Sequence, residues 1–142
     1  MENRYLYKAQ RVDNGEWEIG SLIILPNGKY EIANGCANPP DSDPMWKECV
    51  ITHIVDPDTI CRCTGFQDRN DRLTWENDIA KDETGNLFKA FWQENYYQFS
   101  WICVKSEKLP IGAKWNLWNF KRSEIEVIGN IFDNKELLER EE

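Results

Sequence analysis

The sequence predicts a mainly β protein, with an N-terminal β-hairpin region followed by an SH3-like β-barrel and a short C-terminal helix. Three observations support this prediction: apolar residues alternate at period two, turn-forming clusters recur about every eight to twelve residues, and 13% of the 142 residues are aromatic. A chain of this length can bury about two-thirds of its unfolded surface. We therefore expect one domain, 1–142, with the hairpin and a Pro-rich loop in 1–48 and the barrel core in 49–142.

The first predicted hairpin precedes the Pro-rich loop. The run EWEIGSLIIL is typical of extended chain, and Asn27-Gly28 supplies a tight turn because both residue types adopt positive φ readily. The run YEIA then returns with Tyr30 and Ile32 on one face. The segment NGCANPPDSDPMWKE, residues 34–48, contains three prolines and three acidic residues, so we expect it to be a loop rather than a helix or strand.

Two further hairpins are predicted in the central part of the chain. In residues 49–64, CVITHIV is β-branched and apolar, DPDT is typical of a turn, and TICRCT is extended again. The strongest hairpin pairs LFKAFWQ with YYQFSWICV, which places Tyr97, Phe99, Trp101 and Cys103 on one face.

The chain is expected to end in a strand and a short helix. The run EIEVIGNIF predicts the strand, and Asp133 and Asn134 are candidate N-caps before a helical turn at Leu137-Leu138. A five-stranded, SH3-like barrel over about residues 60–131 fits this number of strands.

The cysteines raise the question of a metal site. Cys61 and Cys63 share one face of a predicted strand, but their α-carbons are about 6.5 to 7 Å apart, so a zinc ion would require both side chains to lean together. Cys49 and His53 share another face at about 13 Å, and Cys36 would complete a ligand set with no recognised spacing. Buried core thiols and a half-buried histidine are the simpler interpretation, so we expect no metal and no cofactor.

The sequence also contains no recognised pattern of catalytic residues. His53 is the only histidine, and a Cys-His pair would depend on the fold alone. Glu76 and Asp78 could share a face as an acid-base pair or a cation site, although turn caps and solvated charges explain them more simply. We expect Asn77 to adopt the left-handed conformation, Asp78 to accept backbone N–H groups and Ile79 to begin the core face. The prediction is a protein that is not an enzyme, with a metal-dependent enzyme using Glu76 and Asp78 as the second alternative.

The formal charge of −8 opposes general binding of phosphate groups, because nucleic-acid affinity depends largely on Lys and Arg. The acidic residues are expected to form a solvated face, and a patch for a basic partner or for DNA mimicry stays open. A nucleic-acid-binding barrel is the first alternative function, with exposed aromatic rings stacking on bases and Arg62, Arg69 and Arg72 following the backbone.

The start of the chain, MENRYLYKAQ, lacks the apolar stretch of a signal peptide, and no window approaches eighteen apolar residues. We therefore expect a cytoplasmic protein without membrane contact, in which the five cysteines are reduced.

Three blocks of the sequence resemble the YopX family of phage and prophage proteins: YLYKAQRVDNGEWEIGSLI, VDPDTICRCTGFQDRNDRLTWENDIA and EIEVIGNIFDNKELL. The family's Thr-Gly falls on Thr64-Gly65, its Glu-Gly-Asp-Ile element on residues 76–79 and its Ile-Gly-Asn-Ile-Tyr-Asp-Asn-Pro-Glu-Leu ending on residues 128–137. The departures are Asp71 for a turn Gly, Asn77 for Gly, Phe132 for Tyr and Lys135 for Pro. The resemblance implies a phage or prophage origin, a bacterial host and a mostly β, barrel-containing fold, and it implies no particular activity.

The predicted function is that of a non-catalytic binding or adaptor protein, which contacts a protein partner or a second copy of itself. In FWQENYYQFSW, aromatic residues fall on both faces of the hairpin, whereas a two-layer barrel needs only one face for its core. The predicted contact residues are Trp92, Tyr96, Tyr97 and Trp101. The alternative, in which the N-terminal hairpin covers the second face, stays open.

Overall fold

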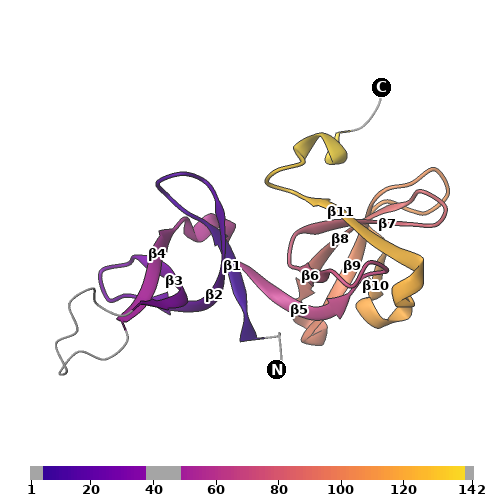
Figure 1. Ribbon diagram of the computed structural model, residues 1–142. Coiled ribbons are helices and arrows are strands. Elements are labelled where there is room, and N and C mark those ends of the chain that lie inside the picture. Colours follow the sequence, from indigo (N-terminus) through magenta and orange to yellow (C-terminus); the bar gives the residue numbers. More distant parts are fainter. Residues whose placement is uncertain (1–4, 38–48, 140–142) are drawn as a thin grey trace. The chain divides into compact units, whose positions relative to one another are not determined.

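A computed structural model describes residues 5–37 and 49–139 of the chain, which Figure 1 shows as a ribbon. These residues form β-strands and short 3-10 helices, and they contain no α-helix. The strands make two antiparallel sheets of six and five strands, which confirms the mainly β prediction. Within the described ranges no closed barrel is detected, so the structure supports the mainly β part of the prediction and not its SH3-like barrel.

The described chain divides into two compact units: the N-terminal unit, residues 5–62, and the C-terminal unit, residues 63–139. Strand β5, Cys61–Gln67, carries the chain from the first unit into the second. Each unit has its own cluster of buried apolar side chains. The prediction of a single domain over 1–142 stays a prediction.

The N-terminal unit is built from four antiparallel strands and the start of β5, in the order β4-β3-β2-β1-β5. The four strands are β1 (Tyr7–Gln10), β2 (Trp17–Ile24), β3 (Tyr30–Ala37) and β4 (Cys49–Val55). The first predicted hairpin is confirmed, because β2 pairs with β3 around a turn in which Gly28 has a φ of 85°. The side chain of Asn27 accepts a hydrogen bond from the Lys29 N–H in this turn.

Two predictions for this unit are corrected. Asn34 to Ala37, placed in the Pro-rich loop, continue β3, and Gly35 to Ala37 pair with β4; the rest of that segment, 38–48, lies outside the described residues. The predicted hairpin of residues 49–64 is also wrong, because β4 pairs with β3 while β5 pairs with β1 and β6. A 3-10 turn capped by Asp56 lies between β4 and β5, where the sequence DPDT indicated a turn.

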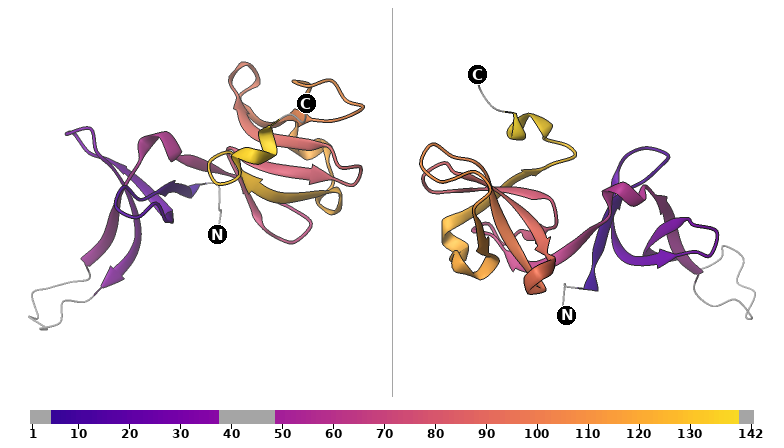
Figure 2. Two further views of the ribbon diagram at one scale, coloured as in Figure 1. Left: turned by 90° about the horizontal axis from the view of Figure 1, so that it is seen from above. Right: turned by 180° about the vertical axis from the view of Figure 1, so that it is seen from behind.

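The strands of the N-terminal unit curl until the end of β1 reaches β4. Arg11 forms an isolated bridge with Val55, and the Val12 N–H donates to the Ile54 carbonyl at 3.1 Å. Figure 2 shows the curvature of these strands from two further sides. The inner face of the curl holds a small core of Ala9, Ile32 and Val55.

The C-terminal unit contains a five-stranded sheet in the order β10-β9-β8-β7-β11, and β6 pairs separately with β5. The strands are β6 (Leu73–Trp75), β7 (Asp78–Asp82), β8 (Leu87–Gln93), β9 (Gln98–Lys105), β10 (Lys114–Asn116) and β11 (Ile125–Asn130). The hairpin predicted as the strongest is confirmed, because β8 pairs with β9 along its whole length. The last predicted strand is confirmed as β11.

The core of the C-terminal unit is dominated by aromatic rings. Trp101 and Phe66 are fully buried and meet edge to face, with ring centroids 6.2 Å apart. Cys63 and Cys103 of this unit are buried, as is Cys61 just before it, as expected for core cysteines. Burial raises the pKa of the Cys103 thiol, so this sulfur stays protonated near neutral pH.

The end of the described chain forms a single 3-10 turn, Lys135–Leu138, instead of the predicted short helix. Asn134 precedes this turn, but its side-chain oxygen accepts from the Asn130 N–H instead of capping the turn. Asn130 in turn accepts the N–H groups of Phe132 and Asp133. These local bonds compete with helix formation, which explains the difference. Within the described ranges, no helix has the length and hydropathy required to cross a membrane.

Candidate functional site

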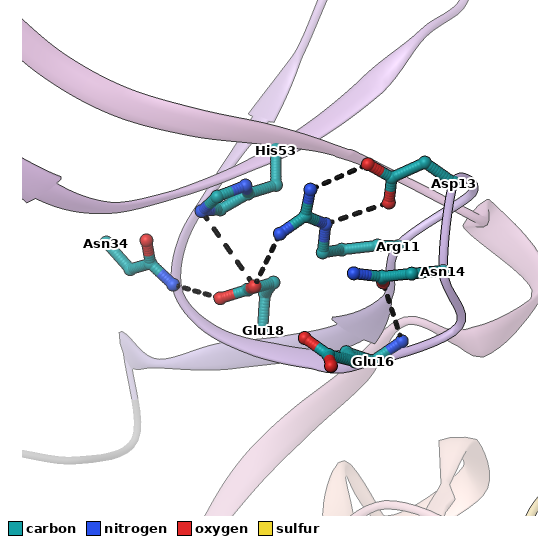
Figure 3. Close-up of polar contacts among 7 residues, drawn as sticks. All are labelled: Arg11, Asp13, Asn14, Glu16, Glu18, Asn34 and His53. Carbon is teal, nitrogen blue, oxygen red and sulfur yellow. Dashed lines mark hydrogen bonds and ion pairs between the residues drawn. The ribbon is translucent and has the colours of Figure 1, made fainter.

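A polar cluster on the inner face of the N-terminal unit is the first candidate site (Figure 3). It takes one side chain from each of four strands or their ends: Arg11 follows β1, Glu18 lies on β2, Asn34 on β3 and His53 on β4. Cross-strand pairing places Glu18 opposite Ala9 and His53 opposite Ile32. The cluster therefore lies on the same face as the core of this unit.

Glu18 is the common partner in this cluster. Its Oε2 accepts from Asn34 Nδ2 at 2.6 Å, and its Oε1 lies 3.5 Å from Arg11 Nη1 and 3.8 Å from His53 Nε2. The side chains of Arg11, Glu18 and His53 are between 17% and 25% exposed, so the cluster is partly shielded from water. Such shielding strengthens each ion pair relative to one on the open surface.

Arg11 also binds Asp13 through a two-pronged contact. Its Nε and Nη2 donate to the two carboxylate oxygens at 2.9 and 2.6 Å. The hydrogen bond with Asp13 raises the pKa of Arg11, and the same bond lowers the pKa of Asp13. The single guanidinium is therefore balanced by two carboxylates, which leaves no excess positive charge on Arg11 for an anionic ligand.

The local fold of β3 brings Asn34 to Glu18. The β3–β4 register shifts by one residue between Ala33 and Gly35, so Asn34 lies in a β-bulge. Gly20 on β2 permits this approach, because a Cβ at Gly20 would collide with the Ala33 carbonyl oxygen and lie 2.9 Å from the Asn34 Cβ. The bulge and the glycine together define the position of the cluster.

The contacts of Glu18 join β2 to the end of β1, to β3 and to β4, so the cluster cross-links neighbouring strands. Glu18 and His53 could exchange a proton in principle, since carboxylate and imidazole are common acid-base groups. However, the carboxylate is already bound by Arg11 and Asn34, and the described contacts give His53 a carboxylate partner rather than the thiol of a Cys-His pair. This use of Glu18 was not predicted; its signal in the sequence is an acidic residue that alternates with Gly20 and Leu22 on the inner face of β2.

The second candidate site is the turn between β8 and β9, where three of the four predicted contact residues lie. We call Trp92, Tyr96 and Tyr97 the aromatic turn. Tyr96 and Tyr97 are 67% and 78% exposed. Trp92 is half-buried, packs against Phe99 with ring centroids 5.0 Å apart, and donates from Nε1 to Glu94 at 2.6 Å.

Two predicted positions differ from the structure in this hairpin. Tyr97 does not share the core face with Trp101 and Cys103, because a 3-10 turn over Glu94–Tyr96 ends in Tyr97 with a left-handed φ of 49°. Trp101 has no exposed surface and packs in the core, so it stabilises the C-terminal unit and is not available as a contact residue.

The predicted carboxylate pair is split between a turn and a strand. Glu76 and Asn77 form the turn before β7, and Asn77 has the expected left-handed φ of 71°. The Asp78 carboxylate is buried and accepts from the Trp75 N–H at 2.8 Å, as expected, and Ile79 is fully buried in the core. Asp78 therefore organises the turn.

A buried carboxylate that was not predicted from the sequence organises the next loop. Asp68 is fully buried, and its oxygens accept the N–H groups of Asn70, Arg72 and Val127 at 2.8 to 2.9 Å. The sequence offers only a weak signal for this role, an Asp two residues before Asn70 in a polar turn. Asp71, in the same loop, has a left-handed φ of 61°, as its replacement of a turn glycine indicated.

The arginines proposed to follow a nucleic-acid backbone are dispersed between the units. Arg62 belongs to the N-terminal unit, whereas Arg69 and Arg72 lie in the Asp68 loop. Arg72 donates to the Val127 carbonyl at 3.3 Å. In the described parts of the chain, no three His, Cys, Asp or Glu side chains gather as a group that could hold a metal ion.

Comparison with known proteins identifies a family. The model of the family described as YopX protein matches residues 26–139, which contain the Thr64-Gly65, 76–79 and 128–137 blocks. The block at residues 5–23 lies before the matched range, as do Arg11 and Glu18 of the polar cluster. No curated protein matches the chain.

Proposed function

The chain belongs to the YopX family, and we propose that it is a non-catalytic binding protein of phage or prophage origin that acts through protein–protein contacts in the cytoplasm of a bacterial host. The observation that supports this function is the aromatic turn. It presents two tyrosines to solvent on a rigid hairpin whose strands belong to the core of the C-terminal unit.

The conformation of Tyr97 is the most informative detail of this turn. A left-handed conformation costs a bulky residue on the order of 1–2 kcal/mol. Tyr97 is 78% exposed, so this conformation buries little of the ring and adds little to the core. Glycine or asparagine would serve the turn at lower cost. A tyrosine here is therefore better explained by contacts outside the unit.

The chemistry of the aromatic turn fits a protein partner. Tyrosine and tryptophan are enriched among residues that dominate binding energy, because they offer a large apolar surface with a polar tip. Trp92 is held by Phe99 and Glu94, so its ring is already oriented before a partner binds. The net charge of −8 favours a partner with a basic rim around an apolar centre.

Affinity purification from a bacterial host, followed by mass spectrometry, tests this function. We expect a stoichiometric protein partner that survives nuclease treatment with the wild-type chain. The double variant Tyr96→Ala/Tyr97→Asn should lose this partner, since Asn suits the backbone of position 97. Tyr5→Ala, which removes another exposed tyrosine (68% exposed), should retain it.

Two outcomes would contradict the proposal. If recovery depends on nucleic acid, the exposed rings stack on bases instead, which is the first alternative. If the double variant retains the partner at wild-type level, the aromatic turn is not the contact surface.

A further inference from the structure

A groove of ≈ 790 Å³ lies in the C-terminal unit, between the ends of β8 and β9 and the terminal 3-10 turn. This volume falls within the range of about 300–1,000 Å³ that is typical of small-molecule sites. All of its lining residues belong to one unit, and none belongs to the aromatic turn. The groove is therefore a separate site.

The apolar part of the groove is made only of aliphatic side chains: Leu87, Val104, Ile111, Ile128 and Leu137. Ile111 is 49% exposed, so part of this apolar surface faces solvent. None of the lining residues is aromatic, so the groove offers no platform for stacking a base or another flat ring. Aliphatic walls of this kind suit a flexible alkyl chain.

Two lysines, Lys105 and Lys108, line the groove together with a single acid, Glu107. Neither lysine forms an ion pair among the residues that the structure describes. Although the whole chain has a charge of −8, the charged residues that line this groove carry one more positive than negative charge. The two lysines complement an anion at one end of an apolar ligand.

Lys105 ends β9, and the loop after it, which carries Lys108, is held in place by Ser106. Its hydroxyl donates to Asn86 Oδ1 at 2.5 Å and accepts the N–H groups of Lys108 and Leu109 at 3.1 and 2.8 Å. The position of the loop is therefore set by the hairpin before a ligand binds, which lowers the entropy cost of binding.

We propose that this groove binds a free, single-chain alkyl carboxylate, with the chain along the aliphatic side chains and the carboxylate at Lys105 and Lys108. Titration of dodecanoate, followed by NMR of the labelled full chain, tests this site. We expect saturable binding with shifts at residues 84–87, 104–108 and 111. Dodecyltrimethylammonium, which has the same chain and the opposite charge, should bind at least about tenfold more weakly.

Substitutions separate the charge from the apolar contact. Lys105→Gln/Lys108→Gln should weaken dodecanoate binding about tenfold, because each solvent-exposed ion pair contributes about two- to fivefold. Lys114→Gln, on β10 outside the groove, is the matched control and should leave binding unchanged. Ile111→Asn should weaken both amphiphiles, because it removes an apolar wall that they share.

Three results would overturn the proposal. The first is the absence of saturable binding by the wild-type chain, and the second is equal binding of the cationic and anionic amphiphiles. The third is equal loss of dodecanoate binding in Lys114→Gln and in the double lysine variant. Circular dichroism of each variant shows whether its fold is retained, and the single variant Lys108→Gln, at an exposed position, repeats the charge test with less risk to the fold.

Discussion

The carboxylates of Asp68, Asp78 and Asp82 each bind backbone N–H groups of a turn beside them. Short polar side chains prefer such positions, because their oxygens replace the carbonyl acceptors that a turn lacks. The sequence predicted this role for Asp78 but not for Asp68. The burial of Asp68 depends on the Val127 N–H, which is far along the chain, so no local pattern around Asp68 reveals it.

The Asp68 loop gives the first stability prediction. Asp68→Asn replaces one acceptor oxygen with an N–H₂ group that faces backbone N–H donors, so buried donors lose their partner. We expect the free energy of unfolding to fall by about 2–4 kcal/mol, measured by urea denaturation. Asp71→Asn in the same loop keeps a residue that tolerates positive φ and should cost less than about 1 kcal/mol. Equal losses in the two variants would contradict the assigned role of Asp68.

Asp82 gives a prediction for pH dependence. Burial alone would raise the pKa of this carboxyl, but hydrogen bonds from Asn86 and Thr84 outweigh burial, and the pKa is lowered from 3.8. A lowered folded-state pKa adds stability above the unfolded pKa, and this stability is lost as pH falls through the folded pKa. The free energy of unfolding of Asp82→Asn should therefore fall less steeply than that of the wild type as the pH drops below about 4, and urea denaturation at several pH values measures this acid limb.

The control for Asp82 lies in the same turn. Glu83 is exposed, so Glu83→Gln should leave the shape of the acid limb close to wild type. An acid limb of Asp82→Asn that superimposes on the wild-type curve would show that the turn hydrogen bonds do not stabilise the folded state.

For the strands, the alternation of apolar residues and the turn-forming residues between them predicted some pairings and not others. The β2–β3 and β8–β9 hairpins were predicted because a short turn joins adjacent alternating runs. The β4–β5 pairing was wrong because β5 finds its partners in β1 and β6, which no local signal identifies. The predicted alternation of side chains along β9 was also wrong at Tyr97, because the 3-10 turn places this tyrosine before the strand begins.

The bulge of β3 gives a prediction at the same scale. Gly20→Ala would push a methyl group into the Ala33 backbone, so β3 must move and Asn34 must leave Glu18. We expect a loss of about 2 kcal/mol or more in the free energy of unfolding, together with NMR shifts at Arg11, Glu18 and His53.

Gly35 provides a matched control on the adjacent strand. A Cβ there would meet Ile51 at 3.4 Å, the outer limit of a tight contact, and its nearest neighbours are side-chain atoms. Gly35→Ala should therefore cost less than about 1 kcal/mol. If the two alanine variants unfold alike, close approach of β2 and β3 at Gly20 is not what holds the polar cluster.

At the scale of the whole molecule, the sequence predicted a mainly β YopX-family chain, and both statements hold. The division after Arg62 was not predicted, because β5 continues across it without a Gly- or Pro-rich linker. The family blocks include residues that shape local backbone, such as Asn77 and Asn134 in turns and Gly65 with a positive φ inside β5. The proposed contact surface thus depends on the aromatic turn, which those blocks do not include.

The contact role of the aromatic turn is tested most directly by the affinity of the captured partner for the wild-type chain and for Tyr96→Ala/Tyr97→Asn, measured by isothermal titration calorimetry. We expect a loss of at least about 30-fold in Kd, the size expected for residues that dominate an interface, with an unfolding midpoint no lower than that of the wild type. A Kd within about twofold of wild type would contradict the claim that this protein binds its partner through the aromatic turn.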